Sequence, residues 1–332
     1  MPKKIKVAIN GFGRIGRIFT RFVLEDKNIE LVAINDLTDE RTLAHLLKYD
    51  SVHGKWPGEI TASKRTISVN KKDIICFSAK DPLELPWKKL GVDIVVESTG
   101  HFTKREEAEK HLKAGAKKVI ISAPAKSDEV RTVVLGVNDQ LLKSTDTVVS
   151  NASCTTNCAA PMIKIIDELC GIESCYVSTV HSYTGDQRLQ DAPHNDLRRS
   201  RAAALSIIPT TTGAAKAITK IFPHLDGKVG GCGIRVPVPD GSLTDITFIV
   251  KSPKTVEKIN KTFEKYAGGK LKGILAYTED PIVSADCVGD KSSCLFDAQL
   301  TSVIGNMVKV VGWYDNESGY SARLVDLVKR MA

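Results

Sequence analysis

Two kinds of hydrophobic pattern alternate along the first 150 residues. Short apolar runs predict buried strands at residues 4–9, 29–36, 90–98, 117–122 and 132–135. Apolar residues recur at helical spacing over residues 15–23, and residues 104–114 form a second, charged helical segment. Because strands and helices alternate, we expect an α/β domain with a doubly wound parallel sheet over residues 1–150.

The pattern changes after residue 150. Helices are predicted from residue 154 to 169, from within residues 210–216, and over residues 255–266. Strands are predicted at residues 174–180, 229–236, 242–250 and 309–314. This order indicates an α+β domain over residues 151–315, with a mixed or antiparallel sheet and helices on one face. The amphipathic tail, residues 316–332, is expected to pack back on the first domain as a helix.

A glycine motif follows the first predicted strand. The order is a strand, Gly11-x-Gly13-x-x-Gly16, a helix, and a strand that ends at Asp36. Gly11 allows a tight turn, Gly13 lets the backbone approach a pyrophosphate, and Gly16 lets the helix pack closely on the sheet. Asp36 would accept hydrogen bonds from a ribose and repel a 2′-phosphate, which favours NAD over NADP. The alternative is a structural glycine turn beside a solvated aspartate. In its context the motif indicates a Rossmann dinucleotide-binding domain.

Two further strand ends carry small polar residues. Ser98 ends one predicted strand and is followed by Thr99 and Gly100, and Ser122 ends another strand. Open α/β sheets bind ligands at the carboxyl ends of their strands. We therefore expect these residues to lie near the same ligand.

A cysteine stands at the predicted start of the helix after residue 153. Ser153 is suited to cap this helix, which puts Cys154 at its first position. The helix dipole favours an anion there, so we expect a lowered thiol pKa and a better nucleophile. The alternative is a small buried cysteine that packs beneath a helix cap.

Composition narrows the class of protein. A chain of 332 residues fits two domains, and its 42% hydrophobic content is ordinary for a globular protein. No apolar run is long enough to cross a membrane and no signal peptide is expected. Eight dispersed cysteines without metal-ligand spacing indicate reduced thiols, a cytoplasmic location and no metal. The net charge of +8 favours small anionic partners, because no nucleic-acid-binding motif accompanies it.

Long polar loops in compact domains are usually functional or form an interface. Residues 182–205 make up such a segment here, with four arginines and little periodicity.

Six motifs together carry a resemblance. They are Asn10 to Arg17 (NGFGRIGR), Ala152 to Asn157 (ASCTTN), His181 to Thr184 (HSYT), Ile208 to Lys216 (IPTTTGAAK), Arg235 to Pro237 (RVP) and Trp313 to Glu317 (WYDNE). In order and spacing, the chain from about residue 4 to its end resembles the phosphorylating glyceraldehyde-3-phosphate dehydrogenase family, the NAD-dependent, glycolytic type. The cysteine motif is highly specific, whereas the glycine motif alone is not.

The resemblance implies a covalent mechanism. Cys154 would attack the aldehyde of D-glyceraldehyde 3-phosphate to form a thiohemiacetal. His181 would hydrogen-bond the thiolate and then take the hydroxyl proton as hydride leaves for the nicotinamide. The Cys154 backbone N–H and the His181 ring would stabilise the oxyanion. Inorganic phosphate would then attack the thioester and release 1,3-bisphosphoglycerate.

The resemblance also implies binding residues. For the substrate's own phosphate they are Thr184 and Arg235, with Asp186 nearby; for the attacking phosphate they are Ser153, Thr155, Thr212 and Gly213; and Arg198 is a further phosphate ligand. For NAD they are Asn10, Gly11, Gly13, Arg14, Ile15, Asp36, Ser98, Thr99, Gly100, Ser122, Asn316 and Tyr320, with Asn316 on the nicotinamide carboxamide. Thr212 could equally cap a helix. Leu37 and Pro193 match the NAD-specific form of the family.

Assembly and departures from the family pattern follow from the same resemblance. Residues 183–205 resemble the segment that lines a neighbouring subunit's cofactor site, so we expect a homotetramer. Ser318 replaces the usual aromatic residue, which could loosen packing near the nicotinamide, and Cys232 and Cys287 replace other small or apolar residues. Cys158 makes oxidative inactivation of Cys154 plausible, although disulfide formation depends on geometry.

Two other functions stay open from the sequence. An erythrose-4-phosphate dehydrogenase would share the nucleophile and cofactor elements but would release an acid, so phosphate dependence separates the two enzymes. A nucleic-acid- or surface-binding protein could use the same fold as a scaffold, and it would show salt-dependent affinity for RNA that NAD does not affect.

Overall fold

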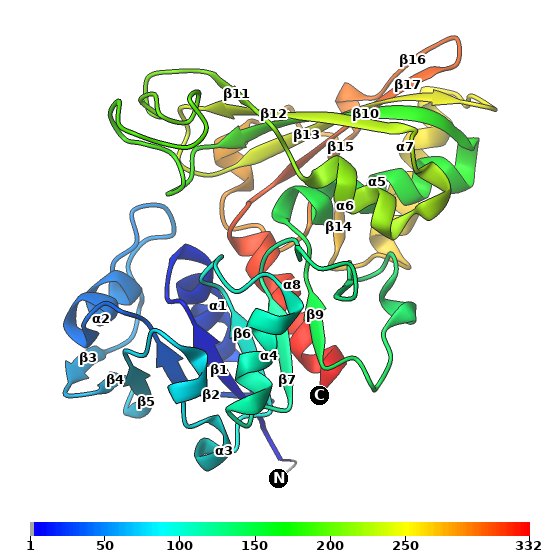
Figure 1. Cartoon of the computed structure of the whole chain (residues 1–332). Coiled ribbons are helices and arrows are strands. Elements are labelled where there is room, and N and C mark those ends of the chain that lie inside the picture. The colour runs from blue at the N-terminus through cyan, green and yellow to red at the C-terminus, as the bar shows by residue number, and fades with distance from the viewer. Residues whose placement is uncertain (1–2) are drawn as a thin grey trace. The chain divides into compact units, whose positions relative to one another are not determined.

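The computed structural model describes residues 3–332 and divides into two compact units (Figure 1). Unit 1 contains the residues up to 133 together with 141–152 and 321–332, and unit 2 contains 134–140 and 153–320. Within the described residues, no helix has the length and apolar character needed to span a lipid bilayer.

Unit 1 is built on one nine-stranded sheet, with strand order β3-β4-β5-β2-β1-β6-β7-β9-β8. Its strands are β1 (Ile5–Asn10), β2 (Ile29–Asn35), β3 (Ile60–Ser63), β4 (Thr66–Val69), β5 (Lys72–Phe77), β6 (Ile94–Glu97), β7 (Lys118–Ile121), β8 (Arg131–Thr132) and β9 (Val148–Ser150). All pairings from β5 to β8 are parallel, and β3 and β4 add an antiparallel hairpin at one edge. The predicted Rossmann-type parallel sheet is confirmed.

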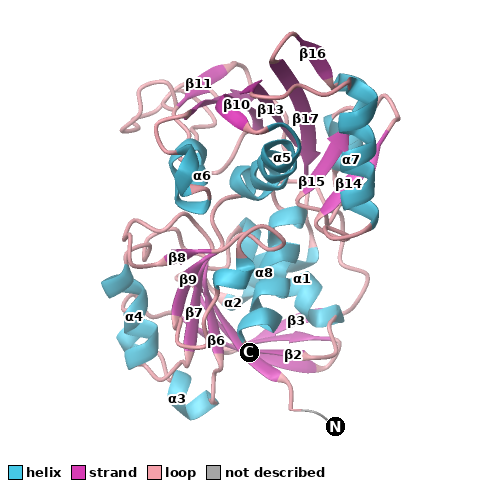
Figure 2. Ribbon diagram, turned by 90° about the vertical axis from the view of Figure 1, so that its right-hand side faces the viewer, coloured by secondary structure: helices cyan, strands magenta, loops and turns pink. Residues whose placement is uncertain are grey.

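Helices lie on both faces of this sheet, as a doubly wound fold requires. They are α1 (Arg14–Glu25), α2 (Glu40–Lys48), α3 (Trp87–Leu90), α4 (Arg105–Lys113) and most of α8 (Ser318–Met331). Figure 2 shows α4 on one side of the sheet and α1 with α8 on the other. An ion pair between Lys329 and Asp26, at 2.5 Å, ties α8 to the end of α1.

Two strand boundaries in unit 1 differ from the prediction. The strand expected at 90–98 begins only at Ile94, because Trp87–Leu90 form a short helix that ends at Gly91 in a left-handed conformation (φ 64°). The strand expected at 132–135 is reduced to the pair Arg131–Thr132. The hairpin β3–β4, strand β5 and helix α2 were not predicted, since their apolar runs are short and interrupted by charged residues.

Unit 2 contains an eight-stranded mixed sheet with strand order β11-β12-β10-β13-β17-β15-β14, and β16 pairs with β17. Its strands are β10 (Ile172–Ser182), β11 (Ile208–Thr210), β12 (Val229–Val236), β13 (Ser242–Val250), β14 (Leu275–Thr278), β15 (Cys294–Asp297), β16 (Ser302–Ile304) and β17 (Met307–Tyr314). The pairs β10–β12 and β14–β15 are parallel and the others are antiparallel. The expected mixed or antiparallel sheet is therefore confirmed.

The helices of unit 2 gather along one side of its sheet (Figure 1). They are α5 (Cys154–Cys170), α6 (Ala214–Ile221) and α7 (Val256–Gly268). Strand β13 alternates buried and partly buried residues along its whole length, which is the signature of a sheet with one covered face. Five short 3-10 helices complete the described chain, at Pro82–Glu84, Asp139–Leu141, Pro223–Leu225, Ser284–Cys287 and Ala298–Leu300.

Two boundaries in unit 2 also differ from the prediction. Strand β10 runs on to Ser182, so that His181 lies inside its end and not beyond it. The segment expected to begin a helix at residues 210–216 starts as strand β11, and helix α6 begins only at Ala214. Between β10 and β11 the long polar loop is present, as expected.

Candidate active site

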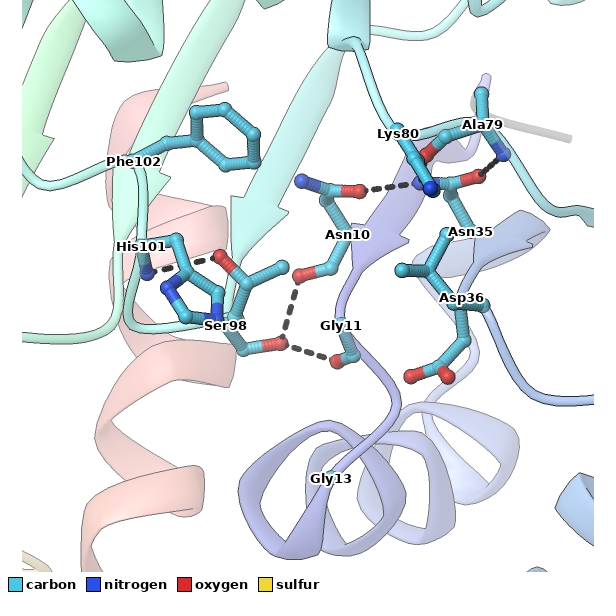
Figure 3. A pocket seen from close by; sticks show the side chains of 12 residues that line it. Asn10, Gly11, Gly13, Asn35, Asp36, Ala79, Lys80, Ser98, His101 and Phe102 are labelled. Carbon is cyan, nitrogen blue, oxygen red and sulfur yellow. Dashed lines mark hydrogen bonds between the residues drawn. The ribbon is translucent and has the colours of Figure 1, made fainter. Parts of the chain in front are cut away.

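A cavity of about 380 Å³ opens at the carboxyl ends of the unit 1 strands (Figure 3). Its lining consists of Asn10, Gly11, Gly13, Asn35, Asp36, Leu37, Ala79, Lys80, Ser98, Thr99, His101 and Phe102. Six residues predicted to bind the cofactor (Asn10, Gly11, Gly13, Asp36, Ser98 and Thr99) are thus brought together in one place. The cavity therefore lies where open α/β sheets bind dinucleotides.

The glycines take the geometry that the motif predicts. Gly11 has φ +92°, and a Cβ atom there would lie 2.6 Å from the backbone nitrogen of Thr99. A Cβ atom on Gly16 would lie 2.5 Å from the carbonyl oxygen of Gly11, so any side chain would push α1 away from the loop. At Gly13 a Cβ atom would meet open space, which leaves the first turn of α1 approachable by a phosphate.

Asp36 is fixed at the end of β2 by two backbone donors. Its Oδ2 atom accepts from Phe12 N–H at 2.7 Å, and its Oδ1 atom accepts from Thr38 N–H at 3.0 Å. The carboxylate remains part of the cavity lining, where it can accept further hydrogen bonds from ribose hydroxyls. The residues of this cavity fit NAD.

Other residues predicted for the cofactor take different positions. Arg14 makes a two-pronged ion pair with Asp50, at 2.6 and 3.1 Å, and Ile15 is partly buried at the start of α1. Among the described residues, the cavity lining does not include Arg14, Ile15, Gly100 or Ser122. Asn316 and Tyr320 are buried residues of unit 2.

Several lining residues escaped the sequence analysis. They are Asn35, Ala79, Lys80, His101 and Phe102. Asn35 directly precedes Asp36 at a strand end, and that position was a signal for it. Ala79 and Lys80 follow β5, a strand that the hydrophobic pattern did not reveal.

The candidate nucleophile and base meet in unit 2. The Ser153 hydroxyl accepts from Thr156 N–H at 3.1 Å, so Ser153 caps α5 and places Cys154 at its first turn, as predicted. Cys154 Sγ lies 3.4 Å from His181 Nε2. Cysteine and histidine within hydrogen-bond reach at a helix N-terminus form the pattern of an activated thiol nucleophile.

The other ring nitrogen of His181 has two neighbours. Nδ1 lies 2.8 Å from the carbonyl oxygen of Ser182 and 2.7 Å from Nη1 of Arg235, which also donates to that carbonyl at 2.8 Å. A proton on Nδ1 is donated to Ser182 and leaves Nε2 able to accept. A proton on Nε2 instead points at the thiol, and Nδ1 then accepts from Arg235.

Burial controls the protonation of this pair. Burial, followed by the charge of Arg235, lowers the pKa of His181 to about 3, so the imidazole is neutral. Burial also raises the pKa of Cys154 to about 11, against the opposing effects of Arg235 and of hydrogen bonds at Thr155. The predicted lowering of the thiol pKa is therefore wrong for the protein alone, because desolvation outweighs the helix N-terminus.

Two buried hydrogen-bond centres support the neighbourhood of the thiol. The Tyr314 hydroxyl lies 2.9 Å from both Thr155 Oγ1 and Thr179 Oγ1. The side-chain oxygen of Asn316 accepts from the hydroxyls of Ser182 and Ser242, at 2.8 and 2.6 Å. With the oxygen thus engaged, the Asn316 amide nitrogen is the group left to meet a ligand.

The predicted phosphate residues fall into two groups. Ser153, Thr155 and Arg235 lie around the Cys154–His181 pair through the contacts above. In the long loop, Asp186 forms an ion pair with Arg199, which also donates to Thr210 Oγ1 at 2.8 Å. Although burial opposes the change, Arg199 lowers the pKa of Asp186.

The charge of Arg199, and not that of Arg198, acts on His181 of the Cys154–His181 pair. It contributes to the lowered pKa values of both His181 and Arg235. Arg198 is exposed, and its backbone N–H donates to Asp196 at 2.9 Å. The sequence analysis missed Arg199 because two adjacent arginines in an irregular loop give no signal for which one points inward.

The remaining predicted residues lie on connecting segments. The backbone N–H of Thr184 lies 3.3 Å from Gln187 Oε1. The hydroxyl of Thr212 accepts from Ala214 N–H at 3.2 Å, so it takes part in starting α6, beside the helix cap Gly213. Because Gly213 is the N-cap of α6 and has no side-chain cap hydrogen bond, Thr212 supports the turn before the helix but is not its cap.

Three residues that depart from the family pattern are also placed. Ser318 is buried at the start of α8 and donates its N–H to Asp315 at 2.7 Å. Cys232 lies 3.9 Å from the Ser178 hydroxyl, and the Cys287 thiol donates to Ser284 O at 3.1 Å. Cys158 is fully buried one turn after Cys154, and all eight cysteines of the described chain are free thiols.

Comparison with known proteins assigns both halves of the chain to one family. Residues 5–105 match the model described as glyceraldehyde 3-phosphate dehydrogenase, NAD binding domain, and residues 153–316 match its C-terminal domain. A glyceraldehyde-3-phosphate dehydrogenase of Geobacillus stearothermophilus is 56% identical over 330 residues, covering 99% of this chain and 98% of that protein. One from Thermotoga maritima is 57% identical over 327 residues, with 98% of each chain covered. Glyceraldehyde-3-phosphate dehydrogenase 2 of Streptomyces avermitilis is 57% identical over 326 residues, with 97% of each covered.

Proposed function

This chain belongs to the glyceraldehyde 3-phosphate dehydrogenase family, and we propose that it oxidises D-glyceraldehyde 3-phosphate with NAD and inorganic phosphate to 1,3-bisphosphoglycerate. The observation that carries the mechanism is the contact of 3.4 Å between Cys154 Sγ and His181 Nε2, at the first turn of α5. The relatives' names support this enzyme and give no support to the erythrose 4-phosphate alternative.

Cys154 is the proposed nucleophile. Its proton passes to His181 Nε2 as the sulfur bonds to the aldehyde carbon, and His181 then gives that proton to the carbonyl oxygen, which completes the thiohemiacetal and leaves Nε2 free again. His181 then accepts the hydroxyl proton while the C–H bond breaks and the carbon loses a hydride, which leaves a thioester on Cys154. A phosphate oxygen attacks the thioester carbon, the C–S bond breaks, and the thiolate leaves to be reprotonated.

The Nδ1–H tautomer of His181 is the one that this sequence of steps needs. With its proton donated to Ser182 O at 2.8 Å, Nε2 is free to accept from the thiol and later from the hydroxyl. In that state Arg235 donates to Ser182 O and not to Nδ1.

Two anions have to be held for the reaction. We assign the substrate's phosphate to Arg235 and Thr184, and the attacking phosphate to Ser153, Thr155 and the start of α6 at Thr212 and Gly213. Arg235 can form two parallel charge-assisted hydrogen bonds to a phosphate. Arg199 takes the role expected for Arg198, because its charge acts on His181. Asp186 orients Arg199 through their ion pair.

NAD is the hydride acceptor when bound. Unit 1 is assigned as the cofactor domain, with Asp36 on the adenosine ribose and the N–H groups at the start of α1 on the pyrophosphate. Unit 2 is assigned as the catalytic domain, with the Asn316 amide nitrogen on the carboxamide. The fixed carboxylate of Asp36 supports NAD over NADP.

Phosphate dependence is the test of this function. NAD reduction by glyceraldehyde 3-phosphate is measured with and without inorganic phosphate, on the wild type and on Cys154→Ser, with Cys158→Ser as the matched control. Turnover that requires phosphate, persists in the control and disappears in Cys154→Ser supports the proposal. Turnover that ignores phosphate, or that survives in Cys154→Ser, contradicts it.

We also propose a homotetramer in the cytoplasm. In the single chain the long loop leaves four apolar side chains 70–85% exposed: Leu189, Leu197, Leu205 and Ile207. Exposed apolar side chains grouped in this way indicate an interface with another subunit. Eight free thiols support a reducing compartment. Sedimentation of the wild type should give the mass of four chains, and Leu197→Asp with Leu205→Asp should give a smaller one. A monomeric wild type would contradict the assembly.

A further inference from the structure

A buried carboxylate lies at the end of β6, next to residues that line the cavity. Glu97 is 1% exposed. Its Oε2 atom accepts from Asn10 Nδ2 at 2.6 Å and lies 3.1 Å from His111 Nε2. Its Oε1 atom accepts from the backbone N–H of Thr99 at 2.8 Å and from the Thr99 hydroxyl at 2.5 Å. Four groups that can donate a hydrogen bond therefore face the two carboxylate oxygens of Glu97.

The indole of Trp87 settles the state of His111. Trp87 Nε1 lies 3.0 Å from His111 Nδ1, and an indole N–H can only donate. His111 Nδ1 is therefore an unprotonated acceptor. The single proton of the neutral ring lies on Nε2, which donates to Glu97. Both rings are fully buried, so this tautomer is held by packing as well.

All four partners of Glu97 are then neutral donors. A carboxylic acid would bring a fifth hydrogen into this arrangement and would leave one of the four donors without an acceptor. Buried carboxylates persist when several hydrogen bonds to the charged form replace water. The geometry therefore fits an ionised Glu97 that is held without a cation.

From Glu97 the hydrogen bonds run into the cavity lining. Strand pairing sets Asn10 beside Asn35 on one side and beside Glu97 on the other. The side-chain oxygen of Asn10 accepts from Asn35 Nδ2 at 2.7 Å, and Asn35 in turn exchanges two hydrogen bonds, both of 2.9 Å, with the backbone of Ala79 (Figure 3). Asn10, Asn35, Ala79 and Thr99 all line the cavity.

We propose that the Glu97 carboxylate is a positioning residue of the cofactor site, which fixes the amide of Asn10 and the loop at Thr99 before NAD binds. The inference rests on the assignment of this cavity to NAD. Glu97 is not part of the cavity lining, so it acts through its neighbours. Because these groups are already ordered before NAD binds, less conformational entropy is lost on binding.

Glutamine cannot replace Glu97 at this position. If its NH₂ group takes the place of Oε2, it faces His111 Nε2–H. That proton stays on Nε2 because the indole N–H of Trp87 donates to Nδ1. If the NH₂ group takes the place of Oε1, it faces the backbone N–H of Thr99. In either orientation one fixed donor meets another donor, and Asn10 or the loop has to move.

The experiment compares NAD binding by titration calorimetry in the wild type and in Glu97→Gln. We expect the Kd for NAD to rise about 5-fold or more, which is the lower end of the cost of one mispaired buried hydrogen bond. At saturating NAD, kcat and the KM for glyceraldehyde 3-phosphate should stay within about twofold. Ile67→Val, in the fully buried core of β4, is the matched control, which lowers stability but leaves the Kd unchanged.

The outcomes separate the two claims. A wild type that does not bind NAD overturns the assigned function. A wild type that binds NAD while Glu97→Gln binds it equally well overturns the positioning role. A second measurement needs no variant: ¹⁵N NMR of the imidazoles should show His111 as a neutral Nε2–H tautomer. An Nδ1–H or cationic His111 would also overturn the inference, even if Glu97→Gln does not fold.

Discussion

Replacing Asp36 by alanine should move the cofactor preference toward NADP. The Asp36 carboxylate is held by Phe12 N–H at 2.7 Å and by Thr38 N–H at 3.0 Å, so it cannot swing away from an incoming phosphate. The carboxylate lines the cavity and would face the 2′ position of the adenosine ribose. The variant removes both an acceptor for NAD and a repulsive charge for NADP.

The size of the effect follows from two terms that both lower the preference for NAD. Unit charges about 4 Å apart repel by about 1 kcal/mol in water and about 4 kcal/mol near a protein surface, and a phosphate monoester carries nearly two charges. With solvent screening, relief for NADP is about 2–4 kcal/mol, or roughly 30- to 1,000-fold. Loss of charge-assisted hydrogen bonds to the ribose costs NAD about 1.5–3 kcal/mol, or roughly 10- to 100-fold.

The assay is kcat/KM with each cofactor at fixed substrate and phosphate. The ratio of NAD to NADP efficiency should fall by roughly 300- to 100,000-fold in Asp36→Ala, the product of these two effects. Asp39→Ala is the control, because Asp39 caps α2 through Thr42 N–H and does not line the cavity. An unchanged ratio in Asp36→Ala, or an equal change in Asp39→Ala, would refute the reasoning.

Three further variants test other parts of the structure. Tyr314→Phe removes a buried hydroxyl that is hydrogen-bonded to Thr155 and Thr179. Thermal denaturation should show a free energy of unfolding lower by about 1–3 kcal/mol, and an unchanged Tm would contradict these contacts. Arg235→Lys should raise the KM for glyceraldehyde 3-phosphate about 10- to 100-fold in steady-state kinetics, because a lysine cannot bond a phosphate in two places, and an unaltered KM would remove Arg235 from that site. Although burial opposes the shift, backbone N–H groups and Arg14 lower the pKa of Asp50 from 3.8 to about 2. The ionised carboxylate therefore contributes its full stabilisation above about pH 4 and loses it as pH falls through about 2. In urea unfolding, Asp50→Asn should lower the free energy of unfolding by about 1–2 kcal/mol at pH 7 after screening and by clearly less at pH 2. An equal cost at both pH values would contradict the linkage.

The sequence predicted those features that depend on local pattern. The glycine turn, the Asp36 strand end and the Ser153 cap each follow from a few neighbouring residues, and each is present in the structure. Strands such as β13 are found because their alternation is regular. The hairpin β3–β4 was missed because its strands are four residues long and its exposed edge is polar, so the pattern is too short to detect.

Features that depend on contacts between distant segments could not be found in this way. Glu97 ends a strand of three aliphatic residues, and nothing local indicates that His111 and Asn10 converge on it from 14 and 87 positions away. The family resemblance named ligands that touch the cofactor, whereas Glu97 acts through those ligands. Similarly, the choice between Arg198 and Arg199 depends on how an irregular loop turns, which spacing does not encode.

The Cys154 thiol shows how magnitudes decide between opposing effects. A helix N-terminus favours an anion by about 0.3–1 kcal/mol, less than one pKa unit, whereas full burial shifts a pKa by up to about 3–5 units. Values of about 11 for Cys154 and about 3 for His181 oppose proton transfer from sulfur to Nε2 by ~11 kcal/mol. Attraction between the resulting charges, 3.4 Å apart, returns about 5 kcal/mol at an effective dielectric constant near 20.

Interactions with the bound reactants have to supply the remaining free energy of proton transfer. Arg235 is the largest cause of the lowered His181 pKa after burial, so a phosphate that neutralises Arg235 makes the imidazole more basic when substrate is present. Substrate binding and nucleophile activation are therefore coupled through one guanidinium, whose Nη1 lies 2.7 Å from the His181 ring.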